Sequence, residues 1–117
     1  MAVDVTSVVV CVQDIGDDEA ESLAPLFKLL SDANRLRIFA LLMQGERCVC
    51  DIEAVTRLQQ NLVSHHLRVL RDANLIGCRR DGRWAYYRIN RAELERVHPC
   101  VSMLFNPDHL SDARAAC

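Results

Sequence analysis

The sequence predicts a mainly α-helical domain that carries one β-hairpin. Three observations support this fold class. Apolar residues recur at helical spacing in four segments between residues 17 and 74, two strand-like runs flank Asp81-Gly82, and one more helical segment follows them. A chain of 117 residues is long enough for one domain with a buried core.

The first two helices are predicted from their starts and their apolar spacing. The acidic run Asp17–Glu19 suits the positive end of a helix dipole. Ser31-Asp32 interrupts the first pattern and can cap a second helix, which continues to Gly45. The apolar residues with helical spacing are Leu23, Leu26, Phe27 and Leu30 in the first helix, and Leu36, Ile38, Phe39, Leu41 and Leu42 in the second.

Two shorter helices should follow with a tight connection. We expect the third at roughly 50–57, with Ile52 and Val55 facing inward. The fourth opens at Gln59-Gln60-Asn61 and ends near Asn74. Its inward residues should be Leu62, Val63, Leu67 and Leu70, and its outward residues Gln60, Ser64, His65, Arg68 and Arg71. His66 is expected to pack inward or to form a local hydrogen bond.

The runs 75–80 and 83–89 around Asp81-Gly82 form a strong hairpin signal. A last helix is expected at about 91–105, where Pro99 would bend it, break it or mark its start. This order of helices followed by a hairpin is typical of a winged helix–turn–helix. We therefore predict an N-terminal arm at 1–16, the winged domain at 17–105 and a C-terminal tail at 106–117.

The charge distribution points to a partner that the net charge does not. The whole chain carries −2, but residues 64–91 hold seven arginines against two aspartates, a net charge of +5. A basic segment in an acidic chain suggests a local footprint for phosphates. Thirteen of the fourteen basic residues are arginine, which suits phosphate or guanine contacts and equally fits a GC-rich genome.

No apolar stretch approaches the roughly 18 residues of a membrane span, and no basic residue precedes the short valine-rich run. We therefore expect a cytoplasmic protein without a membrane partner. In a reducing compartment the six cysteines indicate metal binding or redox chemistry rather than structural disulfides.

The fourth helix has the residues that a DNA recognition helix needs. Amide and small side chains near its start can approach base edges in the major groove, and arginines one and two turns later can meet phosphates. The hairpin, or wing, carries further arginines at its tip. The predicted DNA-binding residues are Gln60, Asn61, Ser64, His65, Arg68, Arg71, Arg80 and Arg83. The plainer alternative is a solvated helix face, and Trp84, Tyr86 and Tyr87 are expected to pack in the strands and at a dimer contact rather than to stack on bases.

Cys48 and Cys50 lie in the stretch "ERCVCDI". Residues two apart in a helix point about 200° apart, so both thiols can grip one ion only if Cys48 precedes the helix and Cys50 lies in its first turn. The helix dipole and Arg47 should then lower the thiol pKa. The alternative is that the two cysteines are small core residues, and Cys78 is expected to fill the core at the first wing strand.

Residues 22–90 resemble the ArsR/SmtB family of metal-sensing repressors. The matching stretches are "SDANRLRIFALL", "ERCVCDI", "VSHHLRVLRDANLI" and "RRDGRWAYYRIN", in the right order and at the right spacing. The resemblance implies that the "CVC" segment binds thiophilic ions and that binding releases operator DNA. It also implies a homodimer, joined through its first and last helices, on a palindromic operator.

Two thiolates need a third ligand. Arsenic-sensing relatives often have another cysteine three residues after the pair, but this chain has Glu53 there. Cadmium- and lead-sensing relatives recruit cysteines from the arm, so Cys11 is our expected third ligand, with Cys100, Cys117 or no protein group as alternatives. The resemblance favours As(III) or Sb(III) as inducer, with Cd(II) or Pb(II) as the alternative. The last helix lacks the family's zinc-site spacing, because His98 stands alone there.

Three other functions compete with metal sensing. A redox-sensing repressor would oxidise Cys48 and Cys50, or either of them with Cys11, because a disulfide spanning one residue is strained and reducible. A constitutive DNA-binding protein would keep the thiols without using them. We do not expect an enzyme, because the sequence has no glycine-rich phosphate loop and no acid–base constellation.

Overall fold

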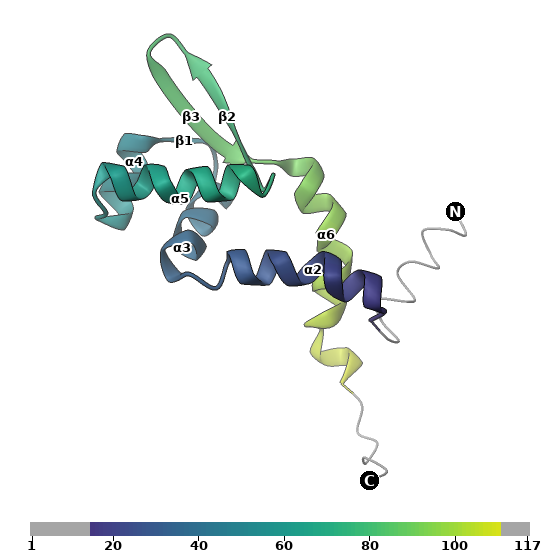
Figure 1. The fold of residues 1–117 in the computed structure, drawn as a ribbon. Coiled ribbons are helices and arrows are strands. Elements are labelled where there is room, and N and C mark those ends of the chain that lie inside the picture. Colours follow the sequence, from purple (N-terminus) through teal and green to yellow (C-terminus); the bar gives the residue numbers. More distant parts are fainter. Residues whose placement is uncertain (1–14, 111–117) are drawn as a thin grey trace.

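The computed structural model describes residues 15–110, and its architecture confirms the mainly helical class with a hairpin (Figure 1). Among these residues, the elements before the hairpin are α2 (Asp17–Leu29), α3 (Ala33–Met43), β1 (Arg47–Cys48), α4 (Val49–Thr56) and α5 (Gln60–Asp72). The hairpin consists of β2 (Ile76–Asp81) and β3 (Trp84–Ile89), and it is followed by α6 (Arg91–Leu104) and a 3₁₀ turn at Pro107–His109. The arm with Cys11 and the end with Cys117 lie outside the described residues.

The ends of the helices lie where the capping residues predict them. The Asp32 carboxylate accepts hydrogen bonds from the amides of Asn34 at 2.8 Å and Arg35 at 3.2 Å, so it caps α3. The bond from the Arg35 amide is the main reason why the pKa of Asp32 is lowered. Asn74 has a left-handed φ of 65°, which ends the turn after α5. Pro99 lies inside α6, which continues through it to Leu104.

The sheet has one strand more than the sequence predicts. Its order is β1-β3-β2, with both pairings antiparallel. β1 is only two residues long, and it pairs Arg47 with Tyr87 and Cys48 with Tyr86. A two-residue strand has no periodicity to detect, which is why the sequence pattern missed it. The hairpin turns through Gly82 and Arg83, and Gly82 alone of these two has a positive φ, 61°.

The core lies between α3, α4, α5 and the base of the hairpin. Ile38, Ile52, Val63 and Leu70 are completely buried there. Leu67, Leu75 and Ile76 complete the same cluster with Leu41 and Leu42 of α3. The α2 and α6 helices cross on the other side of the molecule (Figure 1), and each of them has one buried residue, Leu23 and Val97 respectively. The winged unit is thus held by its own core, and the hairpin projects from it.

Some inward-facing predictions are wrong. Val55 is 60% exposed and Leu62 is 40% exposed, because each lies beside the buried stripe of its helix rather than within it. Trp84 is 52% exposed, since it lies next to the hairpin tip beyond the reach of the core, so it does not pack within the strands of one chain, and its expected place at a dimer contact stays a prediction. Cys78 is only half-buried. Tyr87 does pack against the core, as expected, and His66 is buried.

Candidate nucleic-acid interface and thiol pair

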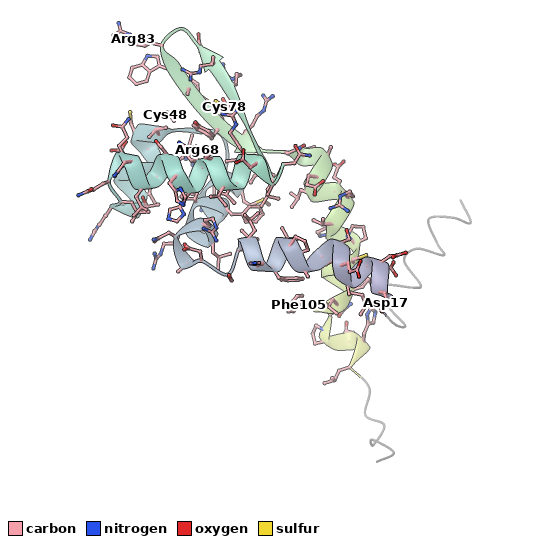
Figure 2. All side chains as sticks on the ribbon, in the orientation of Figure 1. Asp17, Cys48, Arg68, Cys78, Arg83 and Phe105 are labelled. Carbon is pink, nitrogen blue, oxygen red and sulfur yellow. The ribbon has the colours of Figure 1, made fainter. Side chains whose placement is uncertain are left out.

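The outward face of α5 and the hairpin tip present a polar, basic surface. Figure 2 places Arg68 on α5 and Arg83 at the end of the hairpin. All eight residues expected to bind DNA have exposed side chains: Gln60, Asn61, Ser64, His65, Arg68, Arg71, Arg80 and Arg83. This exposure follows from the strong amphipathicity of α5, whose opposite face supplies the buried residues Val63, Leu67 and Leu70.

A polar groove runs between α5 and the middle of β3. Its volume is about 450 Å³, and it is lined by Ser64, Arg68, Arg71, Asp72 and Tyr87. The structure thus brings three of the predicted residues to one concave surface, with a tyrosine from the wing on its other side. Guanidinium groups in such a groove suit the bidentate binding of phosphate oxygens.

The ion pairs divide the arginines of α5 and the wing into two groups. Arg79 is held by Glu46, with 2.7 Å between Arg79 Nη2 and Glu46 Oε1. Within residues 15–110, Arg68, Arg71, Arg80 and Arg83 form no ion pair. These four side chains therefore offer their charge to an external anion without first breaking an internal contact.

Asn61 differs from its neighbours at the start of α5. Its side-chain oxygen accepts a hydrogen bond from the Leu62 amide at 2.9 Å, so that oxygen satisfies a backbone donor of the first turn. The Asn61 oxygen therefore shares its acceptor capacity with the backbone. The Gln60 side chain keeps both its amide oxygen and its amide nitrogen for a base edge. The bidentate recognition of adenine needs a donor and an acceptor on the same amide, and the Gln60 side chain can offer both without sharing its oxygen with the backbone.

His66 fixes the inward side of α5. Its side chain is 5% exposed, and its Nδ1 has no hydrogen-bond partner among the described residues. Burial lowers the pKa of His66 below its usual value of 6.5, with Asp32 opposing this effect and with Arg35 and His65 adding to it. The neutral imidazole is thus the form that suits the folded chain.

This burial predicts an acid-sensitive fold. Between the lowered folded pKa and about 6.5, the unfolded chain binds more protons than the folded chain, so the free energy of unfolding falls as the pH drops. We expect His66→Leu to remove this contribution to the pH dependence. Urea unfolding of the parent and the variant between about pH 5 and 7.5 measures the difference in slope. His65→Gln is the matched control, because His65 is exposed, and parallel curves for parent and His66→Leu would contradict the prediction.

Cys48 and Cys50 meet at the junction of β1 and α4. Cys48 is the last residue of β1 and the N-cap of α4, and Cys50 is the second residue of that helix. This is the arrangement that the helix geometry requires for two thiols to bind one ion. Figure 2 shows Cys48 beside the sheet, at the start of α4, and α4 packs on α5.

The Cys50 thiol interacts with the Cys48 thiol. A hydrogen bond with Cys48 is the main reason why the pKa of Cys50 is raised, and the charge of Cys48, burial and Glu53 act in the same direction. The expectation that the helix dipole and Arg47 lower the pKa is therefore wrong for Cys50. The Arg47 guanidinium instead donates a hydrogen bond to the Glu46 carbonyl at 3.0 Å. Two adjacent thiolates repel one another, so a cation must supply the charge that stabilises both.

The other described cysteines do not join this pair within one chain. Cys78 pairs with Tyr87 and Cys48 pairs with Tyr86, and because neighbouring residues of a strand face opposite sides, Cys78 lies on the other face of the sheet. Cys100 lies on α6, which is on the far side of the molecule from α4 (Figure 1). Across residues 15–110 there is no cluster of three or more His, Cys, Asp or Glu that could hold a metal.

Sequence reasoning missed two features next to the thiol pair. One is β1, and the other is the Glu46–Arg79 contact, which joins residues 33 positions apart. The opposite charges of Glu46 and Arg79 are visible in the sequence, but only the register of three strands brings them together.

No helix in the described part of the chain is long and apolar enough to span a membrane.

Comparison with known proteins gives a consistent picture. A model of the "Bacterial regulatory protein, arsR family" matches residues 32–77. The chain is 42% identical to a transcriptional repressor SmtB homolog of Synechocystis, over 82% of this chain and 69% of that protein. It is 33% identical to the arsenical resistance operon repressor of Staphylococcus aureus, over 83% and 89% of the two chains. It is 30% identical to a cadmium resistance regulatory protein CadC homolog of S. aureus, over 73% and 71%.

Solved structures agree with these relatives. A possible transcriptional regulator for arsenical resistance superposes with a TM-score of 0.60 at 28% identity, covering 76% of this chain and 96% of that one. The family model itself matches the part of the chain from the cap of α3 through α5 to the start of β2.

Proposed function

This chain belongs to the ArsR/SmtB family of metal(loid)-responsive helix–turn–helix regulators, and from that premise we propose that it represses transcription until an ion binds Cys48 and Cys50. Members of the family are DNA-binding regulators and not enzymes. The observation that carries the proposal is the thiol pair at the start of α4, because α4 packs directly against α5. A repressor acts where the chromosome lies, so we propose a cytoplasmic location.

We propose that a homodimer binds a palindromic operator. The start of α5 would enter the major groove, where Gln60, Asn61, Ser64 and His65 meet base edges. Arg68 and Arg71 would hold phosphates along the groove beside Tyr87. Arg80 and Arg83 would contact the DNA next to that site. The dimer contact would use α2 and α6. Phe27 of α2 and Phe105, which follows α6, are exposed beside these helices and form a tilted ring pair within one chain, with 5.9 Å between centroids.

For the inducer we propose As(III) or Sb(III), bound by Cys48, Cys50 and Cys11. Three thiolates in a trigonal-pyramidal arrangement suit these ions, and arsenical repressors are among the relatives at 30% identity or more. Because Glu53 replaces the cysteine that would otherwise follow the pair, the third thiolate has to come from outside α4. Cys11 in the N-terminal arm is the proposed source, from the same chain or from the partner.

Cd(II) or Pb(II) is the alternative inducer. The observation in its favour is the same missing cysteine on α4, together with a cadmium resistance regulator among the relatives. Both ions are soft enough for thiolates and accept an additional ligand. The two inducers are distinguished by their effect on one DNA complex.

The test uses a duplex selected from a random library for binding to the reduced protein. Fluorescence anisotropy gives the dissociation constant with no ion, with arsenite and with Cd(II). We expect arsenite to weaken binding by about 5–150-fold, the usual size of such coupling. Release by Cd(II), or by Pb(II) tested in the same way, but not by arsenite would assign the alternative, and tight binding in the presence of all three ions would refute metal sensing. Failure to select any duplex would refute DNA binding.

The wing contact gives a separate prediction. Arg83→Ala should weaken binding to every duplex by a similar factor and reduce the slope of log affinity against log salt by about one, because one phosphate contact is lost. Lys28→Ala removes the same charge from the exposed last turn of α2 and is the control. An unchanged salt slope for Arg83→Ala would show that this side chain does not contact phosphate.

A further inference from the structure

The strand that carries Cys48 is part of the wing sheet. β1 pairs with β3, which places Cys48 directly opposite Tyr86, and β3 pairs with β2, which places Tyr86 directly opposite Arg79. Residues opposite one another in neighbouring strands share a face, so Cys48, Tyr86 and Arg79 form one row across the sheet. A displacement of Cys48 is therefore a displacement of the edge of the wing.

Glu46, two residues before Cys48, contacts Arg79 at the opposite end of this row. Arg79 Nε lies 3.2 Å from Glu46 Oε2, and Arg79 Nη2 lies 2.7 Å from Glu46 Oε1, so the contact is bidentate. The Arg79 guanidinium also stacks over Tyr86, 4.8 Å from the ring centroid. We call this contact the Glu46–Arg79 bridge. It joins the residue two positions before Cys48 to the outer strand of the hairpin, passing over the strand between them.

The geometry of the bridge suits positioning better than stabilisation. Exposed ion pairs add little to folding stability, and the Arg79 and Glu46 side chains are 42% and 30% exposed. A bidentate guanidinium–carboxylate contact stacked on a ring does fix the relative orientation of the groups that it joins. β1 has only two paired residues, so without the bridge it has little hold on the hairpin.

We propose that the Glu46–Arg79 bridge transmits the occupancy of the thiol pair to the wing. This inference rests on the proposed function, because it concerns the path from the bound ion to the DNA. An ion that binds both thiolates fixes Cys48 relative to Cys50 at the start of α4. The constraint on Cys48 reaches β3 through the ladder and β2 through the bridge, so the two strands of the wing shift together. The wing tip, with Arg80 and Arg83, then no longer fits the DNA that α5 reads.

Glu46→Gln tests the proposal, because it keeps the shape of the side chain and removes the charge-assisted bidentate contact. Asp81→Asn is the matched control. Asp81 also faces Arg79, with 4.0 Å between Arg79 Nη1 and Asp81 Oδ2, but it lies at the wing tip and does not reach β1. Both substitutions remove one negative charge beside the same arginine. The exchange Glu46→Arg with Arg79→Glu restores an ion pair of reversed direction.

Each protein is titrated with the selected duplex, with and without arsenite, or with Cd(II) if that ion releases the parent. Hydrogen exchange of the 76–89 segment, with and without the ion and in the absence of DNA, reports on the wing directly. We expect Glu46→Gln to bind DNA within about threefold of the parent and to lose the same thiols to the ion. Its release factor should fall from the parent's value, about 5–150-fold, towards one. Asp81→Asn should respond like the parent, and the exchange should recover part of the response.

Three results would overturn the proposal. One is a Glu46→Gln release factor equal to that of the parent. Another is hydrogen exchange in the wing of the parent that the ion leaves unchanged. The third is an equal loss of response in Asp81→Asn, which would assign the effect to charge alone. A parent that responds to neither ion would instead refute the proposed function, and the bridge would then have no signal to transmit.

Discussion

Replacing Cys50 with serine will abolish the release of DNA by arsenite and leave the binding of DNA by the free protein within about threefold of the parent. Serine keeps the size of the side chain but offers a hard, weakly acidic hydroxyl that does not bind soft ions. Cys50 is exposed and lies outside the buried core, so its loss should not disturb α4. Anisotropy titrations of the selected duplex with and without arsenite measure both effects.

Cys78→Ser is the matched control for this prediction. It changes the same atom in a cysteine that lies on the other face of the sheet, so it should retain the response to arsenite. Two results would contradict the account. If Cys50→Ser failed to bind DNA, its thiol would have a structural role, and if it still released DNA on arsenite, the inducer site would lie elsewhere.

Gln60→Ala will weaken binding to the selected duplex by about 1–3 kcal/mol and relax the preference at one base pair of each half-site. Gln60 is exposed at the first position of α5 and keeps both its amide oxygen and its amide nitrogen for a base. Repeating the selection from the random library with the variant identifies the base pair that is no longer specified. The expected loss corresponds to about 5–150-fold in the dissociation constant.

The control for Gln60→Ala is Gln44→Ala, which removes the same side chain from the exposed end of α3 and should have no effect. An equal loss of affinity on every duplex would show that Gln60 contacts the DNA backbone and does not read a base. An unchanged affinity would place the start of α5 outside the major groove.

Local chemistry made most of the fold predictable. Asp17–Glu19 and Asp32 mark helix starts because they satisfy backbone donors or the helix dipole, and Asn74 marks an end because it tolerates a positive φ. Gly82 marks the hairpin turn for the same reason, although the turn residues are Gly82 and Arg83, one position beyond the predicted Asp81-Gly82, because Asp81 still pairs with Trp84 as the last residue of β2. These signals need no knowledge of distant residues. The buried stripe was harder to predict than the helices themselves, and Val55 and Leu62 were misplaced because an amphipathic helix buries only a narrow set of its positions.

The candidate site divides in the same way. The polar face of α5 could be read from periodicity, and the placement of Cys48 and Cys50 followed from the geometry of a helix start. The hydrogen bond that raises the pKa of Cys50 depends on how the two thiols face each other, which spacing does not specify. The partner of Arg79 depends on strand register, and it lies 33 residues away in the sequence. The contact with Glu46 was therefore found only in the structure.

The most direct test of the central claim counts thiols and bound DNA in the same samples. The reduced protein, saturated with a fluorescent selected duplex, is titrated with arsenite under anaerobic conditions, and Cys11→Ser is titrated beside it. The account predicts that DNA is released in step with the loss of three thiols per chain in the parent, those of Cys11, Cys48 and Cys50, and of two in the variant. Release of DNA without any loss of thiols, or loss of thiols while the DNA stays bound, would contradict it.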